Sequence, residues 1–249
     1  MNAFNIESNY ENHVLLRRKN KGDASALVGR TAMLLFFVND KISQWTPSAR
    51  QKFSKTHDDA MKTITEKAKD FSVSVTIDTF VEEVTVPLSA EVGFNPTSEV
   101  SDEWIDWIMS KYSKKFFKGY RKHYKETLGY DQVAVAFAFN RDFRACAQQA
   151  ATSAPEYSFL DAYASERTII HELFHQFGAE DIYIFENCME SVRKLNYASV
   201  MAYKGGIHID SITAYVIGWS NEIDDSGVKL LELIKHLKLK DVIAFRKRS

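Results

Sequence analysis

The stretch from His171 to Asp181, which reads His-Glu-Leu-Phe-His-Gln-Phe-Gly-Ala-Glu-Asp, constrains this chain more than any other part of its sequence. Residues four apart share a helix face, so His171 and His175 can bind one metal ion together. Glu172 lies beside them, in position to take a proton from a metal-bound water. Gly178 can adopt the left-handed conformation that ends a helix and reverses the chain, which would bring Asp181 round as a third ligand. The stretch predicts a metal-binding helix followed by a tight turn.

The number of ligands indicates the kind of site. Three protein ligands leave a fourth position for water, which is typical of catalytic rather than structural Zn²⁺. The alternative is an amphipathic helix with ordinary interface histidines, because a bare His-Glu-x-x-His pattern also arises by chance. The flanks Thr168–Ile170 and Leu173–Phe174 are apolar and predict a buried helix. Buried histidines need partners, since unpaired polar groups there cost about 1–3 kcal/mol each.

A second motif, Ser199-Val200-Met201-Ala202-Tyr203, follows downstream. Together the two motifs resemble the metzincin signature, a long zinc-binding motif followed by a tight turn that carries a methionine. The resemblance implies that Met201 forms a hydrophobic floor beneath the zinc ligands. It also implies that Tyr203 lies near the metal as a switchable fifth ligand, as in astacin-like and serralysin-like metzincins. The segment 210–219 resembles the helix that follows the methionine turn in that family.

The third ligand position departs from the usual metzincin pattern, which has histidine where this chain has Asp181. The small snapalysin-like proteases are similar to this chain in using aspartate there. A carboxylate oxygen is an accepted zinc ligand. Its extra negative charge would make the zinc a weaker Lewis acid, so we expect a raised pKa for the bound water.

Other candidate ligands have weaker spacing. Glu186 and Glu190 lie at distances along the chain loosely like the glutamate ligand of thermolysin-type enzymes, a family that lacks a methionine turn. His208 follows the turn and could approach the site, but we interpret it as a pocket-wall or surface residue. The remaining histidines have no partner spacing and are expected on solvated faces: His13, His57, His123 and His236.

Hydrophobic periodicity predicts alternating strands and helices. The apolar run 32–38 predicts a strand covered on both faces, and Thr46-Pro47 predicts the start of a helix that extends to Phe71. A second strand begins at Val73, and a phase shift over 80–86 indicates a bulge or hairpin. Further elements follow in order: a loop over 87–101, a long helix over about 102–128, a central strand over 133–139, an edge strand over 143–150, a strand over 156–164, and the motif helix capped by Ser165.

This order predicts an α/β (α+β) fold. The metzincin resemblance implies a zincin with a mixed twisted sheet, an antiparallel edge strand, two long helices plus the active-site helix, and a small, mostly helical C-terminal lobe. We expect a loose polar lead-in over 1–24, an N-terminal lobe with the zinc helix over 25–178, and a C-terminal lobe with the third ligand and methionine turn over 179–249.

Composition bounds the remaining possibilities. The chain has 249 residues, 45% of them hydrophobic, which suits one large domain or two lobes. A net charge of −1 gives no global electrostatic reason to expect nucleic acid. The basic, aromatic segment 111–125 could bind nucleic acid or an anionic membrane surface, but we interpret it as an amphipathic helix. Cys146 and Cys188 could form one bridge or remain thiols.

No apolar run is long enough to cross a membrane, and the N-terminal residues lack the features of a secretory signal. We therefore expect a cytoplasmic protein or export by another route, unless Met1 precedes a mature secreted domain.

The motifs predict a monomeric zinc endopeptidase that acts on protein or peptide substrates. Glu172 would be the general base, and Tyr203 would donate a hydrogen bond to the developing oxyanion. The edge strand around 146–150 would pair with an extended peptide, and residues 204–210 would line a side-chain pocket with a Gly205-Gly206 hinge. Two alternatives remain: a catalytically silent metzincin-like binding protein, and a protease effector or toxin with a narrow target.

Overall fold

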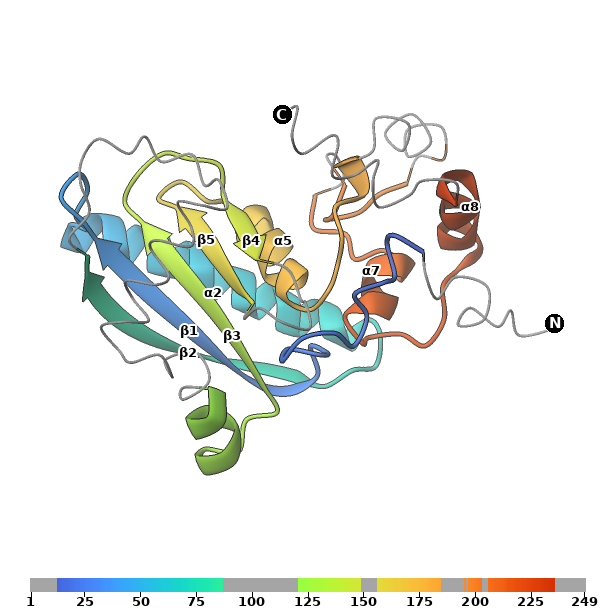
Figure 1. The fold of residues 1–249 in the computed structure, drawn as a ribbon, viewed down its shortest axis with the longest axis horizontal. Coiled ribbons are helices and arrows are strands. Elements are labelled where there is room, and N and C mark those ends of the chain that lie inside the picture. The colour runs from blue at the N-terminus through green and yellow to red at the C-terminus, as the bar shows by residue number, and fades with distance from the viewer. Residues whose placement is uncertain are drawn as a thin grey trace.

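A five-stranded mixed sheet forms the centre of the protein, in the order β2-β1-β3-β5-β4 (Figure 1). The computed structural model describes residues 13–86, 121–148, 156–184, 195, 197–202 and 206–235. The strands are β1 (Gly29–Asn39), β2 (Val75–Thr85), β3 (Gln132–Phe139), β4 (Cys146–Gln148) and β5 (Tyr157–Asp161). Neighbours pair in parallel except β4, which is antiparallel to β5 at the sheet edge. The fold is therefore mixed α/β, and the predicted antiparallel edge strand is confirmed.

Strands β1 and β3 are buried on both faces, as predicted. In β1, Met33 and Leu35 face one hydrophobic core while Leu34 and Phe36 face the other. In β3 the two faces differ in size: one carries three alanines, and the other carries Val133, Val135, Phe137 and Phe139. Helices pack over the alanine face, because small side chains allow close approach.

The predicted bulge or hairpin over 80–86 is wrong. β2 is one continuous strand that pairs residue for residue with β1, from Gly29↔Val75 to Asn39↔Thr85. Val75 and Ile77 pack in the same core as the helices, whereas Phe80 and Val84 pack in the opposite core. The phase shift reflects a change in which face of this edge strand is covered, not an inserted residue.

Helix α2 (Pro47–Lys69) begins as predicted, with Thr46 accepting a hydrogen bond from Ala49 N–H and proline in the first turn. It covers the same face of the sheet as α5 (Glu166–Gln176) (Figure 1). Of the predicted long helix 102–128, the described part begins at residue 121 and contains the π-helical turn η1 (His123–Thr127). The rest of that prediction lies outside the described residues.

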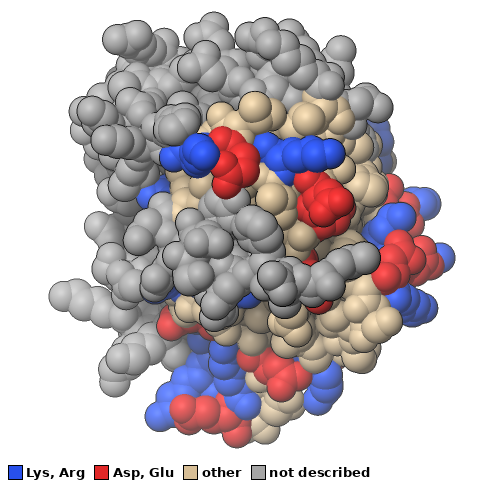
Figure 2. Space-filling model, turned by 90° about the vertical axis from the view of Figure 1, so that its right-hand side faces the viewer, with Lys and Arg blue, Asp and Glu red and all other residues tan. Residues whose placement is uncertain are grey.

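Within the described residues, three short helices follow the motif helix: η2 (Ile182–Ile184), α7 (Ser211–Val216) and α8 (Asp225–Ile234). α7 and α8 lie to one side of the sheet in Figure 1. On the face seen in Figure 2, lysine and arginine side chains lie next to aspartate and glutamate side chains. No helix within the described residues is long and apolar enough to cross a membrane.

The described part of the lead-in is not loose, contrary to prediction. Residues 13–20 form hydrogen-bonded turns that place Val14, Leu15 and Leu16 in the core at 1–6% exposure. Arg17 and Arg18 both pair with the buried carboxylate of Glu180. The apolar run is only three residues long, too short for a periodicity argument to distinguish it from a solvated turn.

Two histidines expected on solvated faces are also buried. His57 is fully buried on α2, where it shares a stripe with Phe53, Ala60, Met61 and Ile64. This helical spacing was visible in the sequence. His13 accepts a hydrogen bond from Leu15 N–H through Nδ1, and its Nε2 lies 3.2 Å from the carbonyl oxygen of Leu231. His123 is exposed, as expected.

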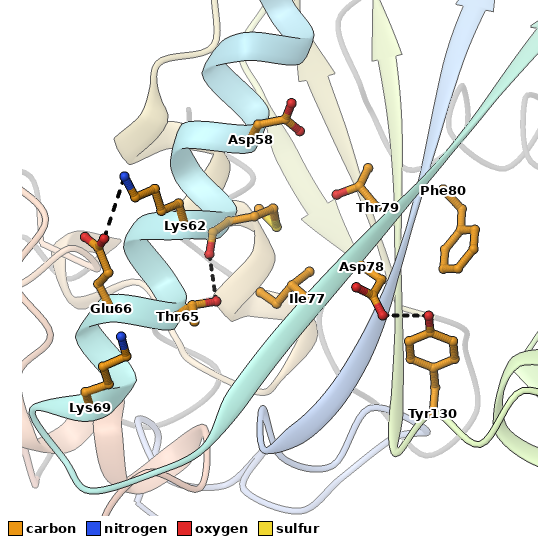
Figure 3. Close-up of a pocket in the computed structure, with 11 residues that line it drawn as sticks. Asp58, Lys62, Thr65, Glu66, Lys69, Ile77, Asp78, Thr79, Phe80 and Tyr130 are labelled. Atoms are coloured by element: carbon orange, nitrogen blue, oxygen red, sulfur yellow. Dashed lines mark hydrogen bonds and ion pairs between the residues drawn. The ribbon is translucent and has the colours of Figure 1, made fainter.

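An open groove of about 710 Å³ lies between α2 and β2 (Figure 3). Met61, Ile77 and Phe80 provide its apolar lining, and Lys62, Glu66, Lys69 and Asp78 surround them. The groove lies at the opposite edge of the sheet from β4, and no candidate metal ligand lines it.

Candidate metal centre

The motif helix α5 has a defined cap at each end. Ser165 accepts a hydrogen bond from Thr168 N–H at the N-terminus. At the other end Gly178 has φ +93°, and two hydrogen bonds close the turn, from Gly178 N–H to His175 O and from Ala179 N–H to Phe174 O. These bonds form a Schellman motif. Every residue from Ile169 to Gln176 is buried, so the helix crosses the core.

Both motif histidines direct their Nε2 atoms towards the same carboxylate oxygen, that of Asp181. His171 Nδ1 lies 3.0 Å from the carbonyl oxygen of Val200, and His175 Nδ1 lies 2.7 Å from that of Ala179. A carbonyl only accepts hydrogen bonds, so both Nδ1 atoms carry a proton, and a ring that is neutral has its lone pair on Nε2. Metal-binding histidines show this same arrangement, in which a backbone acceptor sets the tautomer.

Asp181 lies next to both histidines. Its Oδ1 lies 3.0 Å from His171 Nε2 and 3.2 Å from His175 Nε2. Oδ1 is buried and, with each ring carrying its proton on Nδ1, has no hydrogen-bond donor among the described residues. With both rings neutral, three acceptor atoms therefore converge on one point. Their separations fit the edge of a tetrahedron around a metal with bonds of 2.0–2.1 Å, which is about 3.3 Å.

The charges at this point favour a proton or a metal cation. Burial lowers the pKa of His175, but the nearby carboxylates of Asp181 and Glu172 outweigh burial and raise it to about 9. Burial raises the pKa of Asp181, and attraction to His175 and His171 outweighs it, so the carboxyl stays ionised well below its usual range. Without a metal, the site holds protons to balance its carboxylates. A divalent cation can take their place.

Glu172 is the fourth ionisable group of the site. Its Oε1 lies 4.0 Å from His171 Nε2, farther than Asp181 lies from either histidine. His171, Glu172 and His175 also form a group whose donor atoms lie within 4.8 Å of one another. The shorter distances favour Asp181 as the third ligand and leave Glu172 beside the ligands. Burial raises the pKa of Glu172, and both histidines and Arg144 act against that shift.

The turn over residues 199–202 packs directly against both ligand-bearing segments. Val200 O accepts from His171, and Met201 O accepts a hydrogen bond from Ile182 N–H, next to Asp181. Met201 itself is fully buried. Its position beneath the ligands stays a prediction, and Tyr203 lies outside the described residues.

Two charged side chains form hydrogen bonds with this turn. Arg167, one helical turn before His171, donates hydrogen bonds to the carbonyl oxygens of Val200, Ala202 and Gly206. Asp210 accepts hydrogen bonds from the backbone and side chain of the α7 N-terminus and from Tyr197 and Ser199. The turn is therefore tied to the metal helix on one side and to α7 on the other.

Several other predicted residues are not brought to the site. His208 is exposed, whereas Glu186, Glu190, Cys188 and the segment 203–205 lie outside the described residues. Cys146 is a free thiol in β4, and burial raises its pKa to about 12.

Sequence reasoning missed three groups that support the centre. Arg167 could have been found, since it lies four residues before His171 on the same helix face. Gln176 bonds both backbone groups of Val135 in β3, and Ser158 bonds the carbonyl of Glu172, which fix α5 to the sheet. The third group is the pair Arg144 and Tyr183, joined by a hydrogen bond of 3.3 Å.

No protein-family model matches this chain, and no curated protein matches it.

Proposed function

We propose that this chain is a metzincin-like zinc endopeptidase, with His171, His175 and Asp181 as metal ligands and Glu172 as general base. One observation carries the proposal: three buried lone-pair atoms converge on one point, and the third, Asp181 Oδ1, has no hydrogen-bond partner among the described residues. A buried carboxylate without a donor costs several kcal/mol unless a cation or proton neutralises it.

The donor set supports zinc. Two imidazole nitrogens and one carboxylate oxygen are ligands that catalytic zinc accepts, with one position left for water. The same set also suits Fe(II). A second buried carboxylate beside the ligands, that of Glu172, favours hydrolysis, because it provides a base within reach of a water in the site.

Zinc held by His171, His175 and Asp181 would supply a water of lowered pKa and a Lewis acid for the substrate carbonyl. Glu172 accepts a proton on its carboxylate during attack and passes it to the leaving amine. Burial raises the pKa of Glu172, which makes its carboxylate a stronger base. Tyr203 keeps its proposed role as a hydrogen-bond donor to the oxyanion.

The sheet supports a peptide substrate. β4 is at the edge of the sheet, antiparallel to β5, and β4 contacts the motif helix α5. An extended peptide can add to such an edge through main-chain hydrogen bonds. A peptide bound in this way would run alongside the helix that carries Glu172.

Cleavage of a complex peptide library by the zinc-loaded protein tests the proposal. Glu172→Ala is expected to keep zinc and lose turnover by at least about 100-fold, the lower end for a catalytic proton transfer. Glu166→Ala, on the first turn of the same helix, is the matched control and is expected to keep both. Bound zinc without cleavage would refute a general endopeptidase and favour one of the two alternatives, a binding protein or a protease with a narrow target. Metal analysis of the purified protein distinguishes zinc from iron.

A further inference from the structure

Arg144 is placed at the metal centre by a tyrosine rather than by an acid. It precedes β4, is exposed, and donates a hydrogen bond of 3.3 Å from Nη2 to the phenol oxygen of Tyr183. The Tyr183 ring lies nearly parallel to the ring of His171, at 21° with centroids 6.0 Å apart. Tyr183 therefore links the guanidinium of Arg144 to the ring of a metal ligand.

The other arginines of the described residues all have an acceptor of a different kind. Each contacts a carboxylate or a backbone carbonyl: Arg17 and Arg18 contact Glu180, Arg30 contacts Asp78, Arg50 contacts Glu83, Arg121 contacts Asp23 and Glu156, Arg141 contacts Asp40, and Arg167 contacts Val200 and Ala202. Arg144 is the exception within this part of the chain. Only one of its five N–H donors has a protein acceptor there.

The charge of Arg144 is fixed beside the site carboxylates without pairing with them. The hydrogen bond with Tyr183 contributes most to raising the pKa of Arg144, and the charges of Asp181 and Glu172 add to it. Neither carboxylate forms an ion pair with it among the described residues. Both already have other roles at the metal centre, so the guanidinium remains available for an anion that enters the site.

We propose that Arg144 binds a carboxylate of the peptide substrate close to the cleaved bond, and that Tyr183 positions it. The proposal rests on the proposed function. A guanidinium presents a planar pair of donors that matches a carboxylate, and it does so better than an amide. The position before β4 places these donors where a peptide paired with the sheet edge would pass. Two sources supply this chemistry: an aspartate or glutamate side chain, or the free C-terminus of the substrate.

Peptide capture by zinc-loaded Glu172→Ala protein tests this without turnover. The probes are random hexapeptide libraries with either glutamate or glutamine at a fixed central position, each with a free or an amidated C-terminus. We expect about 10- to 100-fold tighter binding of the carboxylate-bearing libraries, as for a charge-assisted hydrogen bond. Dependence on the central residue assigns a side chain, and dependence on amidation assigns the C-terminus.

Variants identify the residue responsible. Arg144→Gln is expected to reduce the difference in affinity between carboxylate and amide libraries to within about 2-fold. Arg144→Lys should keep part of that difference because the charge remains. Arg50→Gln, which removes the same charge on α2, is the matched control and should keep all of it. Tyr183→Phe should weaken discrimination without abolishing it.

Two outcomes overturn the proposal: equal binding of carboxylate and amide libraries, or full discrimination in Arg144→Gln. Discrimination by a wild-type protein that cleaves no peptide would instead refute the proposed function and leave the role of Arg144 standing.

Discussion

Replacing Gly178 by alanine tests how closely the N-terminal segment packs on the turn that leads to Asp181, the proposed third ligand. Gly178 has φ +93°, and a Cβ atom there would lie 2.6 Å from the carbonyl oxygen of Arg18 and 3.0 Å from its carbonyl carbon. The left-handed conformation costs a residue with a side chain about 1–2 kcal/mol. Overpacking against backbone adds about 1–3 kcal/mol. We expect Gly178→Ala to lower the free energy of unfolding by about 2–5 kcal/mol.

Gly129 offers a matched control. It has φ +73°, and a Cβ atom there would meet nothing within 4 Å. Gly129→Ala should therefore show the conformational cost alone, about 1–2 kcal/mol. The difference between the two variants measures the contact with Arg18.

The assay is urea denaturation of the zinc-free proteins, followed by zinc titration against a chromogenic chelator. Gly178→Ala should also bind zinc about 10- to 100-fold more weakly, because the turn places Asp181. Gly129→Ala should bind zinc like the wild type. Equal losses of stability in the two variants, with unchanged zinc affinity in both, would refute the packing of the N-terminal segment on this turn.

Two further predictions concern the same segment. Arg17→Gln together with Arg18→Gln removes two cationic partners of the buried carboxylate of Glu180, which should lower the free energy of unfolding by about 3–5 kcal/mol. Adding Glu180→Gln should recover part of that free energy in urea denaturation. Failure to recover would contradict the pairing. Burial lowers the pKa of His13, so the unfolded chain binds its proton first as pH falls below about 6.5. The free energy of unfolding should fall as the pH is lowered from 7 to 5, and it should fall less steeply in His13→Gln. Parallel pH profiles of the wild type and the variant would count against a buried neutral ring.

Local sequence determined the metal helix and most of the strands. Ser165 and Gly178 cap α5 through their own backbone neighbours, and histidines four apart share a face in any helix. The apolar runs of β1 and β3 required burial on both faces whatever elements cover them. These features depend on residues close together in the chain, so their spacing is sufficient to predict them.

Only the tertiary structure decided which distant groups meet. The face of β2 that is buried changes along the strand because different elements cover its two ends, which no periodicity within the strand reveals. The same holds for Arg17 and Arg18, which meet Glu180 from more than a hundred residues away in the chain.

Arg144 shows this division most clearly. In the sequence it is one charged residue before an edge strand, with nothing to distinguish it from a solvated side chain. The fold places it against Tyr183 and beside the carboxylates of Asp181 and Glu172. The motif determined which residues could hold a metal, because ligand spacing is local. The charges that surround this candidate site come from segments brought together by packing, so only the folded chain determines them.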